Sequence, residues 1–365
     1  GNQMKIIDII AGARPNFMKI APIIHAIHKA KDQGKNISYR LVHTGQHYDK
    51  KMSATFFEEL NIPHPNTNLA CGGGSQAEQT AAILVNFEKE LLQNPADLVL
   101  VVGDVTSTMA CAIVAKKLNT KVAHVEAGIR SFDLTMPEEI NRMVTDSITD
   151  YYFTTSEIAN KNLIKEGAKK EQIFYVGNVM IDTLLKNEPR FRKPDLFDSL
   201  ELKKRNYFVL TMHRPANVDE ANKLNLLMDE ILNNTNGLPI VFPIHPRTAK
   251  IFADLGITNP NLKIVDPLGY LEFNYLVKYA KAVITDSGGI TEETTVMGIP
   301  CLTLRDNTER PETITLGTNE LVGTDPKNIK PALLKLFSGN WKEGKIPYLW
   351  DGKAAERIIE GLLTL

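Results

Sequence analysis

The sequence predicts an α/β protein with two tandem domains, each built around a parallel β-sheet. Short runs of apolar and β-branched residues alternate along the chain with longer stretches of helical period. Several runs, such as Leu98–Val102, are apolar without alternation, which is typical of strands buried on both faces of a parallel sheet. The alternation lapses between Asn187 and Arg205, where prolines and charged residues indicate a linker. At 365 residues, the chain is long enough for two such domains.

The first predicted domain covers residues 1–185 and the second covers 186–350. Strands of the first domain are predicted at Lys5–Ala11, Tyr39–Thr44, Asp97–Val102, Lys121–Val125 and Ile173–Val176. Strands of the second are predicted at Tyr207–Thr211, Pro239–Pro243, Leu262–Val265, Ala282–Thr285 and Pro300–Leu304. The amphipathic stretches between strands predict helices on both faces of each sheet. Residues 351–365 predict one more amphipathic helix, whose apolar face must pack against another part of the protein.

Composition and charge exclude several classes of protein. The 42 basic and 43 acidic side chains nearly cancel and form no long block of one sign, which argues against a nucleic-acid partner. The three cysteines are far apart and match no metal-ligand spacing, so we expect no metal, no disulfide framework and a reducing, cytoplasmic location. No apolar stretch approaches the ~20 residues of a membrane-spanning helix, so we expect no membrane contact. Neither a G-x-x-x-x-G-K-[ST] loop nor a G-x-G-x-x-G after the first strand is present, which disfavours ATP hydrolysis and NAD; we expect no cofactor.

The residues just after each strand are the candidate site, because ligands of open parallel sheets bind beyond the carboxyl ends of the strands. One such turn, Asp286–Gly289, lies between a predicted strand and a predicted helix. Backbone N–H groups of Ser287, Gly288 and Gly289 at a helix N-terminus would favour a phosphate. The local sequence leaves an alternative equally open, namely an ordinary turn in which Ser287 caps the helix.

Charged residues near strand ends are further candidates for binding. Arg14 and Lys19 follow the first strand, where Arg can form a forked contact with phosphate oxygens and Lys can add a point charge. Arg310 lies before Pro311 in a charged loop and is a third candidate, although a solvated loop explains it equally well. Glu293 lies about one turn into a predicted helix, where it either accepts the hydroxyls of a ribose or matches the helix dipole.

Three carboxylates near strand ends, Asp104, Glu126 and Glu138, are candidates for acid–base chemistry. Moving a proton on and off carbon requires an acid and a base, and carboxylates grouped in a dry site provide both. A helix cap, a turn and helix-dipole matching explain the same three residues without function. The apolar neighbours of Glu126 nevertheless favour a functional role there, because burying a carboxylate is costly. His213, immediately after a strand of the second domain, can face a ligand, although a lone histidine is more often structural.

Taken in order, these segments resemble the non-hydrolysing UDP-N-acetylglucosamine 2-epimerase family over nearly the whole chain. The resemblance rests on Gly12–Pro15, His43–His47, Val102–Asp104, His124–Arg130, Pro137–Arg142, Gly177-Asn178, Thr285–Glu293 and Arg305–Glu312. It implies a GT-B fold, in which two Rossmann-like domains face a central cleft and the last helix crosses back onto the first domain. It also implies a homodimer and a UDP-sugar substrate, with no nicotinamide or metal.

The reaction that the resemblance implies converts UDP-N-acetylglucosamine reversibly to UDP-N-acetylmannosamine. The C2 proton leaves with anti loss of UDP to give a 2-acetamidoglucal, and UDP and a proton then return, the proton to the other face. By resemblance, Asp104, Glu126 and Glu138 are the acid/base carboxylates, without an assignment of the one that takes the proton, and His213 contacts the diphosphate and the reacting centre. The resemblance also gives the UDP-binding residues as Arg14, Lys19, Ser287, Gly288, Gly289 and Arg310, with Glu293 at the ribose and Leu268–Phe273 at the uracil.

Five residues in four segments depart from the common pattern of the family. Asn16 replaces a common Glu, Thr291 replaces a usual Gln, and Arg247 stands in a segment that usually lacks Arg. Tyr48-Asp49 replaces an Arg-bearing form in a loop that, in the family, helps to hold a second, activating UDP-N-acetylglucosamine. The sequence therefore leaves allosteric activation open.

Three alternative functions remain open at this point. The Gly-Ala-Arg-Pro-x-Phe form also resembles the branch of the family that epimerises UDP-2,3-diacetamido-glucuronate. A GT-B glycosyltransferase would transfer the sugar of a UDP-sugar to an acceptor, for which it needs an acceptor groove and no trio of carboxylates. A nucleotide-sugar binding protein without catalytic activity would need neither Glu126 nor Glu138.

Overall fold

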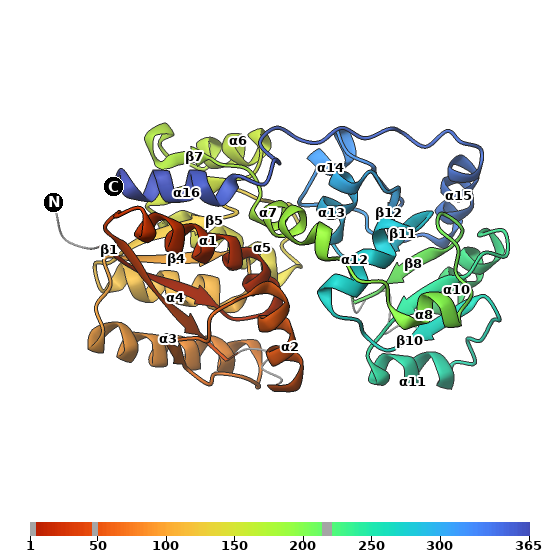
Figure 1. Cartoon of the computed structure of the whole chain (residues 1–365), viewed down its shortest axis with the longest axis horizontal. Coiled ribbons are helices and arrows are strands. Elements are labelled where there is room, and N and C mark those ends of the chain that lie inside the picture. The colour runs from red at the N-terminus through yellow and green to blue at the C-terminus, as the bar shows by residue number, and fades with distance from the viewer. Residues whose placement is uncertain (1–4, 46–49, 214–220) are drawn as a thin grey trace. The chain divides into compact units, whose positions relative to one another are not determined.

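The computed structural model describes residues 5–45, 50–213 and 221–365. Part of the His43–His47 motif and the Tyr48-Asp49 departure lie outside the described residues. The chain forms two compact units (Figure 1). Unit 1 comprises Gly1–Lys186 and Tyr348–Leu365, and unit 2 comprises Asn187–Pro347.

Within the described residues, unit 1 has one sheet of seven parallel strands in the order β3-β2-β1-β4-β5-β6-β7. The strands are β1 (Lys5–Ala11), β2 (Ile37–His43), β3 (Thr67–Asn68), β4 (Leu98–Val102), β5 (Lys121–Val125), β6 (Tyr151–Thr154) and β7 (Ile173–Tyr175). The helices are α1 (Arg14–Asp32), α2 (Lys50–Leu60), α3 (Gln76–Gln93), α4 (Thr106–Lys117), α5 (Pro137–Ile148), α6 (Glu157–Lys165), α7 (Val179–Asn187) and α16 (Ala354–Leu363). Because β1 and β4 are neighbours, the strand order reverses between them, and the loops after these strands lie where ligands bind in such sheets.

The described part of unit 2 has a sheet of six parallel strands in the order β10-β9-β8-β11-β12-β13. The strands are β8 (Phe208–Thr211), β9 (Ile240–Pro243), β10 (Leu262–Val265), β11 (Ala282–Thr285), β12 (Cys301–Thr303) and β13 (Asn319–Leu321). The helices are α8 (Asp195–Ser199), α10 (Ala221–Asn233), α11 (Pro246–Asp254), α12 (Tyr270–Lys278), α13 (Ile290–Met297), α14 (Glu312–Thr315) and α15 (Ile329–Phe337). The order reverses between β8 and β11, so the loops after these two strands form the corresponding switch point of unit 2.

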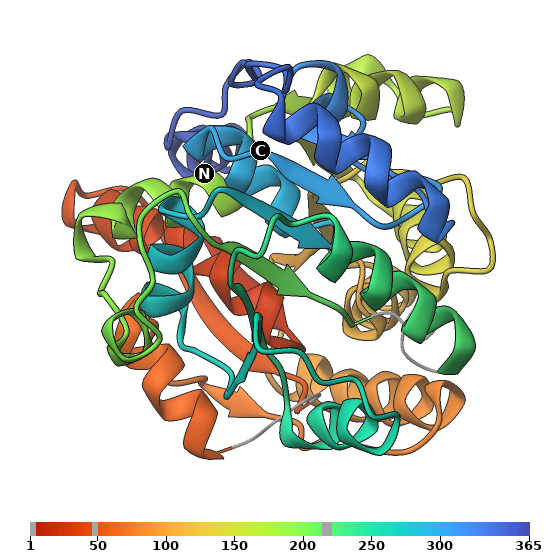
Figure 2. The same cartoon turned by 90° about the vertical axis from the view of Figure 1, so that its right-hand side faces the viewer.

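Each sheet is covered by helices on both faces, as Figure 2 shows for unit 2. Alternate side chains of β8 point to opposite faces. Phe208 and Leu210 pack in a core cluster with Leu224 of α10, whereas Val209 packs in a second cluster with Leu276 of α12. Apolar residues on both faces of one strand explain the continuous apolar runs in the sequence.

The predicted α/β class with parallel sheets is confirmed, and every predicted strand is present. Three short strands, β3, β6 and β13, were not predicted. The predicted linker contains a 3-10 turn at Glu188–Arg190 and the short helix α8.

The C-terminal helix α16 packs on unit 1 beside α1 (Figure 1). Ala354, Ile358 and Leu362 are wholly buried on its apolar face. The first turn of α16 is held by Asp182 of α7, whose two carboxylate oxygens accept hydrogen bonds from the backbone N–H groups of Ala354, at 3.1 Å, and Ala355, at 2.8 Å. A side chain from another helix therefore supplies the N-terminal cap that Lys353 does not provide.

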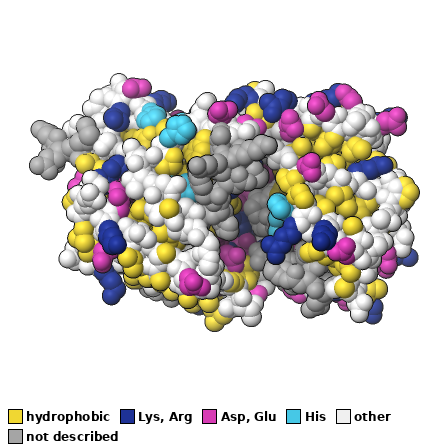
Figure 3. Space-filling model, turned by 90° about the horizontal axis from the view of Figure 1, so that it is seen from below, with side chains coloured by type: hydrophobic (Ala, Val, Ile, Leu, Met, Phe, Trp, Pro, Cys, Tyr) yellow, Lys and Arg dark blue, Asp and Glu magenta, His cyan; other side chains and the backbone are white. Residues whose placement is uncertain are grey.

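Charged side chains of both signs are intermixed on the face shown in Figure 3, and neither sign forms a continuous area over its described residues. Among the described helices, none is long and apolar enough to cross a membrane.

Candidate active site

The loops at the switch point of unit 1 are joined by Asn16, in the first turn of α1. Its side-chain oxygen accepts hydrogen bonds from the backbone N–H groups of Gly12, at 2.9 Å, and Ala13, at 3.2 Å. Its side-chain nitrogen donates to the Val102 carbonyl at the end of β4, at 3.1 Å. The amide, which donates and accepts at once, therefore fixes the loop after β1 against the end of β4.

A buried ion pair lies beside these loops. Lys19 Nζ of α1 is 2.6 Å from Oε1 of Glu126, and the exposed fractions of the two side chains are 10% and 2%. A Cβ at Gly103, after β4, would lie 3.4 Å from that Glu126 oxygen and 3.6 Å from Lys19 Nζ. The loops after β4 and β5 therefore meet around the pair.

Glu126 adopts a costly conformation at the end of β5. Its φ angle is 70°, a left-handed value that costs a residue with a side chain roughly 1–2 kcal/mol. The backbone N–H groups of Glu126 and Ala127 both donate to the Phe153 carbonyl of β6, which holds the turn in place. The second carboxylate oxygen, Oε2, is buried and has no hydrogen-bond partner among the described residues. Among the described residues, this acceptor therefore stays available to a further donor.

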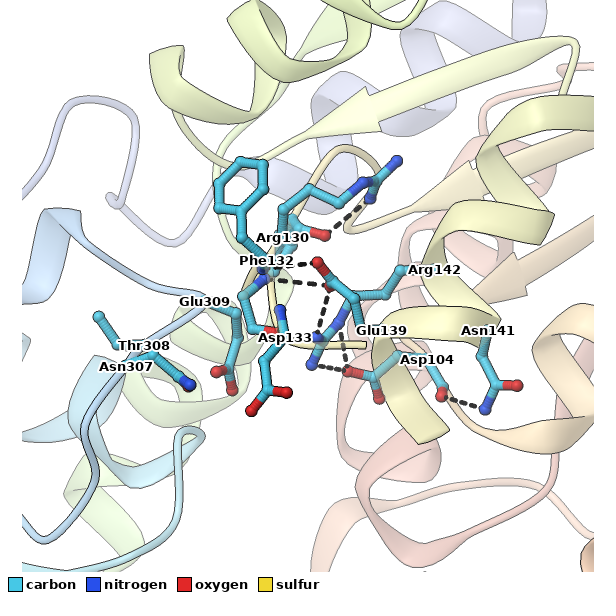
Figure 4. A network of polar contacts seen from close by, with 12 residues as sticks. Asp104, Arg130, Phe132, Asp133, Glu139, Asn141, Arg142, Asn307, Thr308 and Glu309 are labelled. Carbon is cyan, nitrogen blue, oxygen red and sulfur yellow. Dashed lines mark hydrogen bonds and ion pairs between the residues drawn. The ribbon is translucent and has the colours of Figure 1, made fainter. Parts of the chain in front are cut away.

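Asp104 belongs to a second charged network, shown in Figure 4. Its Oδ2 accepts hydrogen bonds from Nε and Nη2 of Arg142 on α5, at 3.1 and 2.7 Å. The same guanidinium is 3.1 Å from Glu139, whose two oxygens also accept from the backbone N–H groups of Ser131 and Phe132. Arg142 and Glu139 are almost wholly buried, whereas the Asp104 side chain is 25% exposed. The network thus orients Asp104 and leaves part of its carboxylate accessible.

Glu138 is half-buried in the first turn of α5, directly after Pro137. Its neighbour Glu139 is the carboxylate that joins the Arg142 network. Helix α4 begins after Val105, which has no capping side-chain hydrogen bond, so the interpretation of Asp104 as the helix cap is wrong.

Behind the two carboxylate loops, His124 of β5 and Asp146 of α5 form a buried pair. His124 Nδ1 is 2.6 Å from Asp146 Oδ1, and His124 Nε2 is 2.7 Å from the Gly103 carbonyl. Asp146 Oδ2 also accepts from the Gly128 N–H and lies 2.9 Å from Arg130. Burial lowers the pKa of His124, but the Asp146 carboxylate and the hydrogen bonds outweigh burial and raise the pKa above its ordinary value.

Arg14 begins α1 and is half-buried, with its guanidinium 4.8 Å from the centre of the Phe56 ring. Burial lowers its pKa, and nearby Glu59 opposes that shift. In the same region, burial lowers the pKa of His43 to about 4. Its Nδ1 accepts the Gly45 N–H at 2.7 Å, so His43 is a neutral structural residue.

The two central loops of unit 2 are joined by Asp286. Both of its oxygens accept the backbone N–H of His213, each at 2.9 Å, and the Asp286 side chain is wholly buried. The His213 imidazole is 70% exposed, and its Nδ1 lies 3.7 Å from Asp286. The carboxylate therefore fixes the backbone at the ends of β8 and β11 and leaves the imidazole ring accessible.

The turn after β11 leads into α13, and no side chain of the described residues caps the N-terminus of this helix. Gly289, not Ser287, is the N-cap residue, so the interpretation of Ser287 as the cap is wrong. The N–H groups of Gly289 and Ile290 open the helix and have no intrahelical acceptor. A Cβ at Gly289 would meet no atom within 4 Å, whereas one at Gly288 would lie 2.6 Å from Arg310 Nη1. The turn thus has space at Gly289 and contacts Arg310 at Gly288.

Arg310 lies in a buried network with two carboxylates. Its Nε is 2.8 Å from Glu292 of α13, and its Nη1 is 2.6 Å from Glu309. Glu309 is also paired with Arg305 at 2.7 Å. The network places the Arg310 guanidinium beside the Gly288 turn with its charge balanced by acidic neighbours.

Glu293 is buried on α13 and accepts a hydrogen bond from the Tyr270 hydroxyl at 3.3 Å. Burial and the charge of Glu292 raise the pKa of Glu293 to about 8, against a lowering by the Tyr270 hydrogen bond. Leu268 and Phe273 pack partly buried against the core of unit 2. Tyr270 and Leu271 between them are buried.

The sequence did not predict the contacts that join the loops, which are made by Asn16, Glu139, Arg142, Asp146, Asp286, Glu309 and Tyr270. Of these, Asp286 lies in the predicted anion-binding turn and Tyr270 in the stretch that the resemblance gives to the uracil. Arg142 and Glu139 lie within a quoted motif, so their positions carried a signal. Among the described residues, no group of three or more His, Cys, Asp or Glu side chains is placed to hold a metal ion.

Unit 1 offers a buried carboxylate with an unused oxygen, and unit 2 offers a helix N-terminus that suits an anion. Together with two Rossmann-like parallel sheets, these features define an enzyme with the GT-B class of fold.

Comparisons with known proteins agree on one family. The sequence profile of the family described as UDP-N-acetylglucosamine 2-epimerase matches residues 29–363. The UDP-N-acetylglucosamine 2-epimerase of Methanocaldococcus jannaschii is 43% identical over 366 residues and 97% of both chains. The UDP-2,3-diacetamido-2,3-dideoxy-D-glucuronate 2-epimerase of Pseudomonas aeruginosa is 39% identical over 99% of this chain and 100% of that protein.

A crystal structure of the M. jannaschii enzyme in complex with UDP-GlcNAc and UDP has a TM-score of 0.89 at 42% identity, covering 99% of this chain and 100% of that chain. The chain belongs to the UDP-N-acetylglucosamine 2-epimerase family.

Proposed function

We propose that this protein catalyses the reversible epimerisation of UDP-N-acetylglucosamine to UDP-N-acetylmannosamine. The observation that carries the proposal is Glu126, a buried carboxylate paired with Lys19 whose Oε2 has no partner among the described residues. A protein that only binds a nucleotide has no need of a strained, buried carboxylate. A proton-transferring enzyme can use one, because a carboxylate in a dry site can move a proton on and off carbon.

The reaction proceeds by elimination and re-addition. A carboxylate removes the proton at C2 while the anomeric C–O bond breaks and its electron pair leaves with UDP, giving 2-acetamidoglucal. UDP then adds back at the anomeric carbon, and a proton is delivered to the opposite face of C2. Asp104, Glu126 and Glu138 are the acid and base candidates for these transfers. The contact with Arg142 supports this role for Asp104, because the guanidinium orients the Asp104 carboxylate and leaves part of that carboxylate exposed.

Unit 2 supplies the groups that stabilise the leaving diphosphate. The uncapped N-terminus of α13 directs backbone N–H groups toward an anion, beside Gly288 and Gly289, and Ser287 adds a half-buried hydroxyl. His213 presents an accessible imidazole from the adjacent loop. Arg14, Lys19 and Arg310 are the proposed cationic ligands of the diphosphate, with Glu293 at the ribose.

A second substrate has a specific observation in its favour. The 39% identity to the P. aeruginosa enzyme that acts on UDP-2,3-diacetamido-2,3-dideoxy-D-glucuronate is close to the 43% identity to the M. jannaschii enzyme. The same elimination chemistry serves both sugars, because the reaction occurs at C2 in each. We further propose that the protein acts as a homodimer in the cytoplasm.

The test is incubation with each UDP-sugar in D₂O, followed by NMR of the C2 position. We expect epimerised product with deuterium at C2 from UDP-N-acetylglucosamine. Product only from the diacetamido-glucuronate would assign the second substrate. Transfer of the sugar to an added acceptor would identify a glycosyltransferase, and both sugars unchanged in the presence of intact UDP binding would contradict the epimerase proposal.

A further inference from the structure

The pair of His124 and Asp146 lies behind the proposed acid–base groups and contacts both of the loops that carry them. His124 is wholly buried, and the structure gives its ring nitrogens two oxygen partners, the Gly103 carbonyl and the Asp146 carboxylate. The Gly103 carbonyl lies directly before Asp104. On the other side, Asp146 accepts the N–H of Gly128, two residues after Glu126, at 2.9 Å.

The partners of the ring decide its protonation state. A carbonyl oxygen only accepts hydrogen bonds, so Nε2 of His124 must carry a proton. Asp146 also accepts from the Gly128 N–H and pairs with Arg130 through Oδ2, and these contacts favour the ionised carboxylate. An ionised carboxylate only accepts, so Nδ1 must carry a proton as well. Both nitrogens are therefore donors, and the ring is an imidazolium.

The charged groups around this ring balance one another. Asp146 faces it from α5, Arg130 faces Asp146, and Glu166 pairs with Arg130 at 2.8 Å. The Tyr152 hydroxyl of β6 donates to the Asp146 backbone carbonyl at 2.6 Å. His124, Asp146 and Arg130 are buried, whereas the Glu166 side chain is 41% exposed. The two cations and two anions together are neutral, which favours a charged histidine at this position.

We propose that His124, as an imidazolium held by Asp146, is a positioning residue for the epimerase reaction. Its Nε2–H fixes the Gly103 carbonyl, and Gly103 in turn lies against the Lys19–Glu126 pair. One ring thereby sets the relative positions of Asp104 and Glu126 without contacting the substrate. The inference rests on the proposed function, since it assigns a role in that reaction.

Two substitutions separate the two hydrogen bonds of the ring. In His124→Gln the amide nitrogen takes the place of Nε2 and retains the bond to Gly103. In His124→Asn the amide nitrogen takes the place of Nδ1, retains the bond to Asp146 and releases Gly103. Both remove the positive charge and replace the ring with an amide. Asn is one methylene shorter than Gln, so the Tm of each variant is measured beside its kcat to report the loss of packing.

The experiment measures kcat, KM and the thermal midpoint Tm of both variants, with His64→Gln as the matched control at an exposed histidine. We expect kcat of His124→Asn to fall about 100-fold below wild type, because a misplacement of about 1 Å has that effect, with KM changed less than about threefold. His124→Gln should retain at least about ten times the kcat of His124→Asn. Equal kcat values for the two variants, with equal losses of Tm, would assign His124 a structural role only and overturn the proposal.

A second experiment, ¹⁵N NMR spectroscopy, measures the protonation state of His124 independently of activity. In a ¹⁵N NMR spectrum of the wild-type imidazoles at about pH 7, we expect one histidine to show two protonated ring nitrogens, and this signal to be absent in His124→Gln. A neutral ring at about pH 7 overturns the imidazolium assignment. Wild-type protein that incorporates no deuterium at C2 of either sugar contradicts the proposed function instead, and the NMR result then still reports on His124.

Discussion

At the scale of single residues, Glu126 combines three unfavourable features. It has a left-handed backbone, a buried charge and an oxygen without a hydrogen-bond partner among the described residues. Strain of this kind persists where the surrounding structure enforces it, and it concentrates at functional sites. The carbonyl of Phe153 and the ammonium of Lys19 enforce it here. We therefore attribute the cost of folding this residue to the role proposed for its carboxylate in the reaction.

Replacement of Glu126 by Gln tests this explanation. Gln retains the volume and can still accept a hydrogen bond from Lys19, but it cannot take up a proton. We expect kcat to fall about 10²–10⁴-fold, with UDP affinity within about threefold of wild type. Steady-state kinetics and calorimetric titration with UDP measure the two quantities. Glu88→Gln, at an exposed site on α3, is the control. Full activity in Glu126→Gln would remove this residue from the mechanism.

Glu293 makes the stability of unit 2 depend on pH. Its pKa is raised from 4.5 to about 8 by burial and by Glu292, so the folded state keeps a proton that the unfolded state releases above pH 4.5. The free energy of unfolding therefore falls as the pH rises from about 4.5 to about 8, at up to about 1.4 kcal/mol per pH unit. The side chain in Glu293→Gln cannot titrate, so the free energy of unfolding of this variant does not show this fall with pH.

Urea denaturation at about pH 5 and about pH 9 measures the effect. We expect Glu293→Gln to gain stability relative to wild type as the pH rises between these values. Glu343→Gln, at an exposed site in unit 2, is the control and should show no such gain. A stability difference between Glu293→Gln and wild type that is the same at both pH values would contradict the assigned pKa.

The sequence predicted the loops that carry the candidate site better than the contacts within them. Glu126 and Asp104 follow strands whose apolar pattern is unmistakable, and polar residues at such positions indicate a site. The hydrogen bond by which Asn16 joins two loops was not predicted, because its partner Val102 lies 86 residues away and no local sequence pattern encodes that contact. The same holds for Asp146, whose role depends on His124, 22 residues before it.

At the scale of secondary-structure elements, α16 depends on a carboxylate from another helix. Asp182 of α7 accepts the first N–H groups of α16, so the docking of the helix and its capping are one event. Burial raises the pKa of Asp182 to about 6, although the N–H groups of Ala355 and Ala354 oppose that shift. The cap is therefore a charged acceptor above about pH 6 and a weaker, protonated one below it.

Removal of this carboxylate should loosen α16. We expect Asp182→Ala to lower the free energy of unfolding by about 0.5–2 kcal/mol and to speed hydrogen exchange in residues 354–363. Denaturant titration and exchange measured by mass spectrometry give the two readouts. Asp198→Ala, at a side chain that is 75% exposed, should change stability by less than about 0.5 kcal/mol. Unchanged exchange in α16 of Asp182→Ala would show that packing alone holds the helix.

Strands were predictable where their apolar runs are long and continuous. β5, β10 and β11 have the predicted bounds because both of their ends coincide with a change to polar residues, and β1 also has its predicted bounds. β3 and β13, which contain two and three residues, are too short to show a period. β6 is different, because Tyr151–Thr154 consists of aromatic and β-branched residues, a composition that favours a strand although none was predicted there.

At the scale of the whole molecule, each unit contains one of the two tryptophans of the chain. Trp350 is buried in unit 1, where its Nε1–H donates to the Thr155 carbonyl at 3.0 Å. Trp341 is partly buried in unit 2, where its Nε1–H donates to the Thr318 carbonyl at 2.8 Å. The fluorescence of each ring therefore reports on a different unit.

Single-tryptophan variants can locate the binding of UDP. Trp350→Phe leaves the reporter of unit 2, and Trp341→Phe leaves the reporter of unit 1. A ligand stabilises the part of a protein that binds it, by about 2.7 kcal/mol at 100 times its Kd. We expect saturating UDP to raise the unfolding midpoint reported by Trp341 more than the one reported by Trp350. A larger rise at Trp350 would place the main diphosphate contacts in unit 1.

The course of the chain through the two units bears on the order in which the protein folds during synthesis. Unit 2 is one continuous segment, Asn187–Pro347, whereas unit 1 is completed only by Tyr348–Leu365. The ribosome makes the chain from its N-terminus, and a domain can finish folding only when its last segment has emerged. Unit 2 can thus finish folding before α16 has been synthesised and can pack against α1. Until residues 354–363 have left the ribosome, the apolar surface of unit 1 that receives α16 stays uncovered, and nascent chains should engage chaperones there.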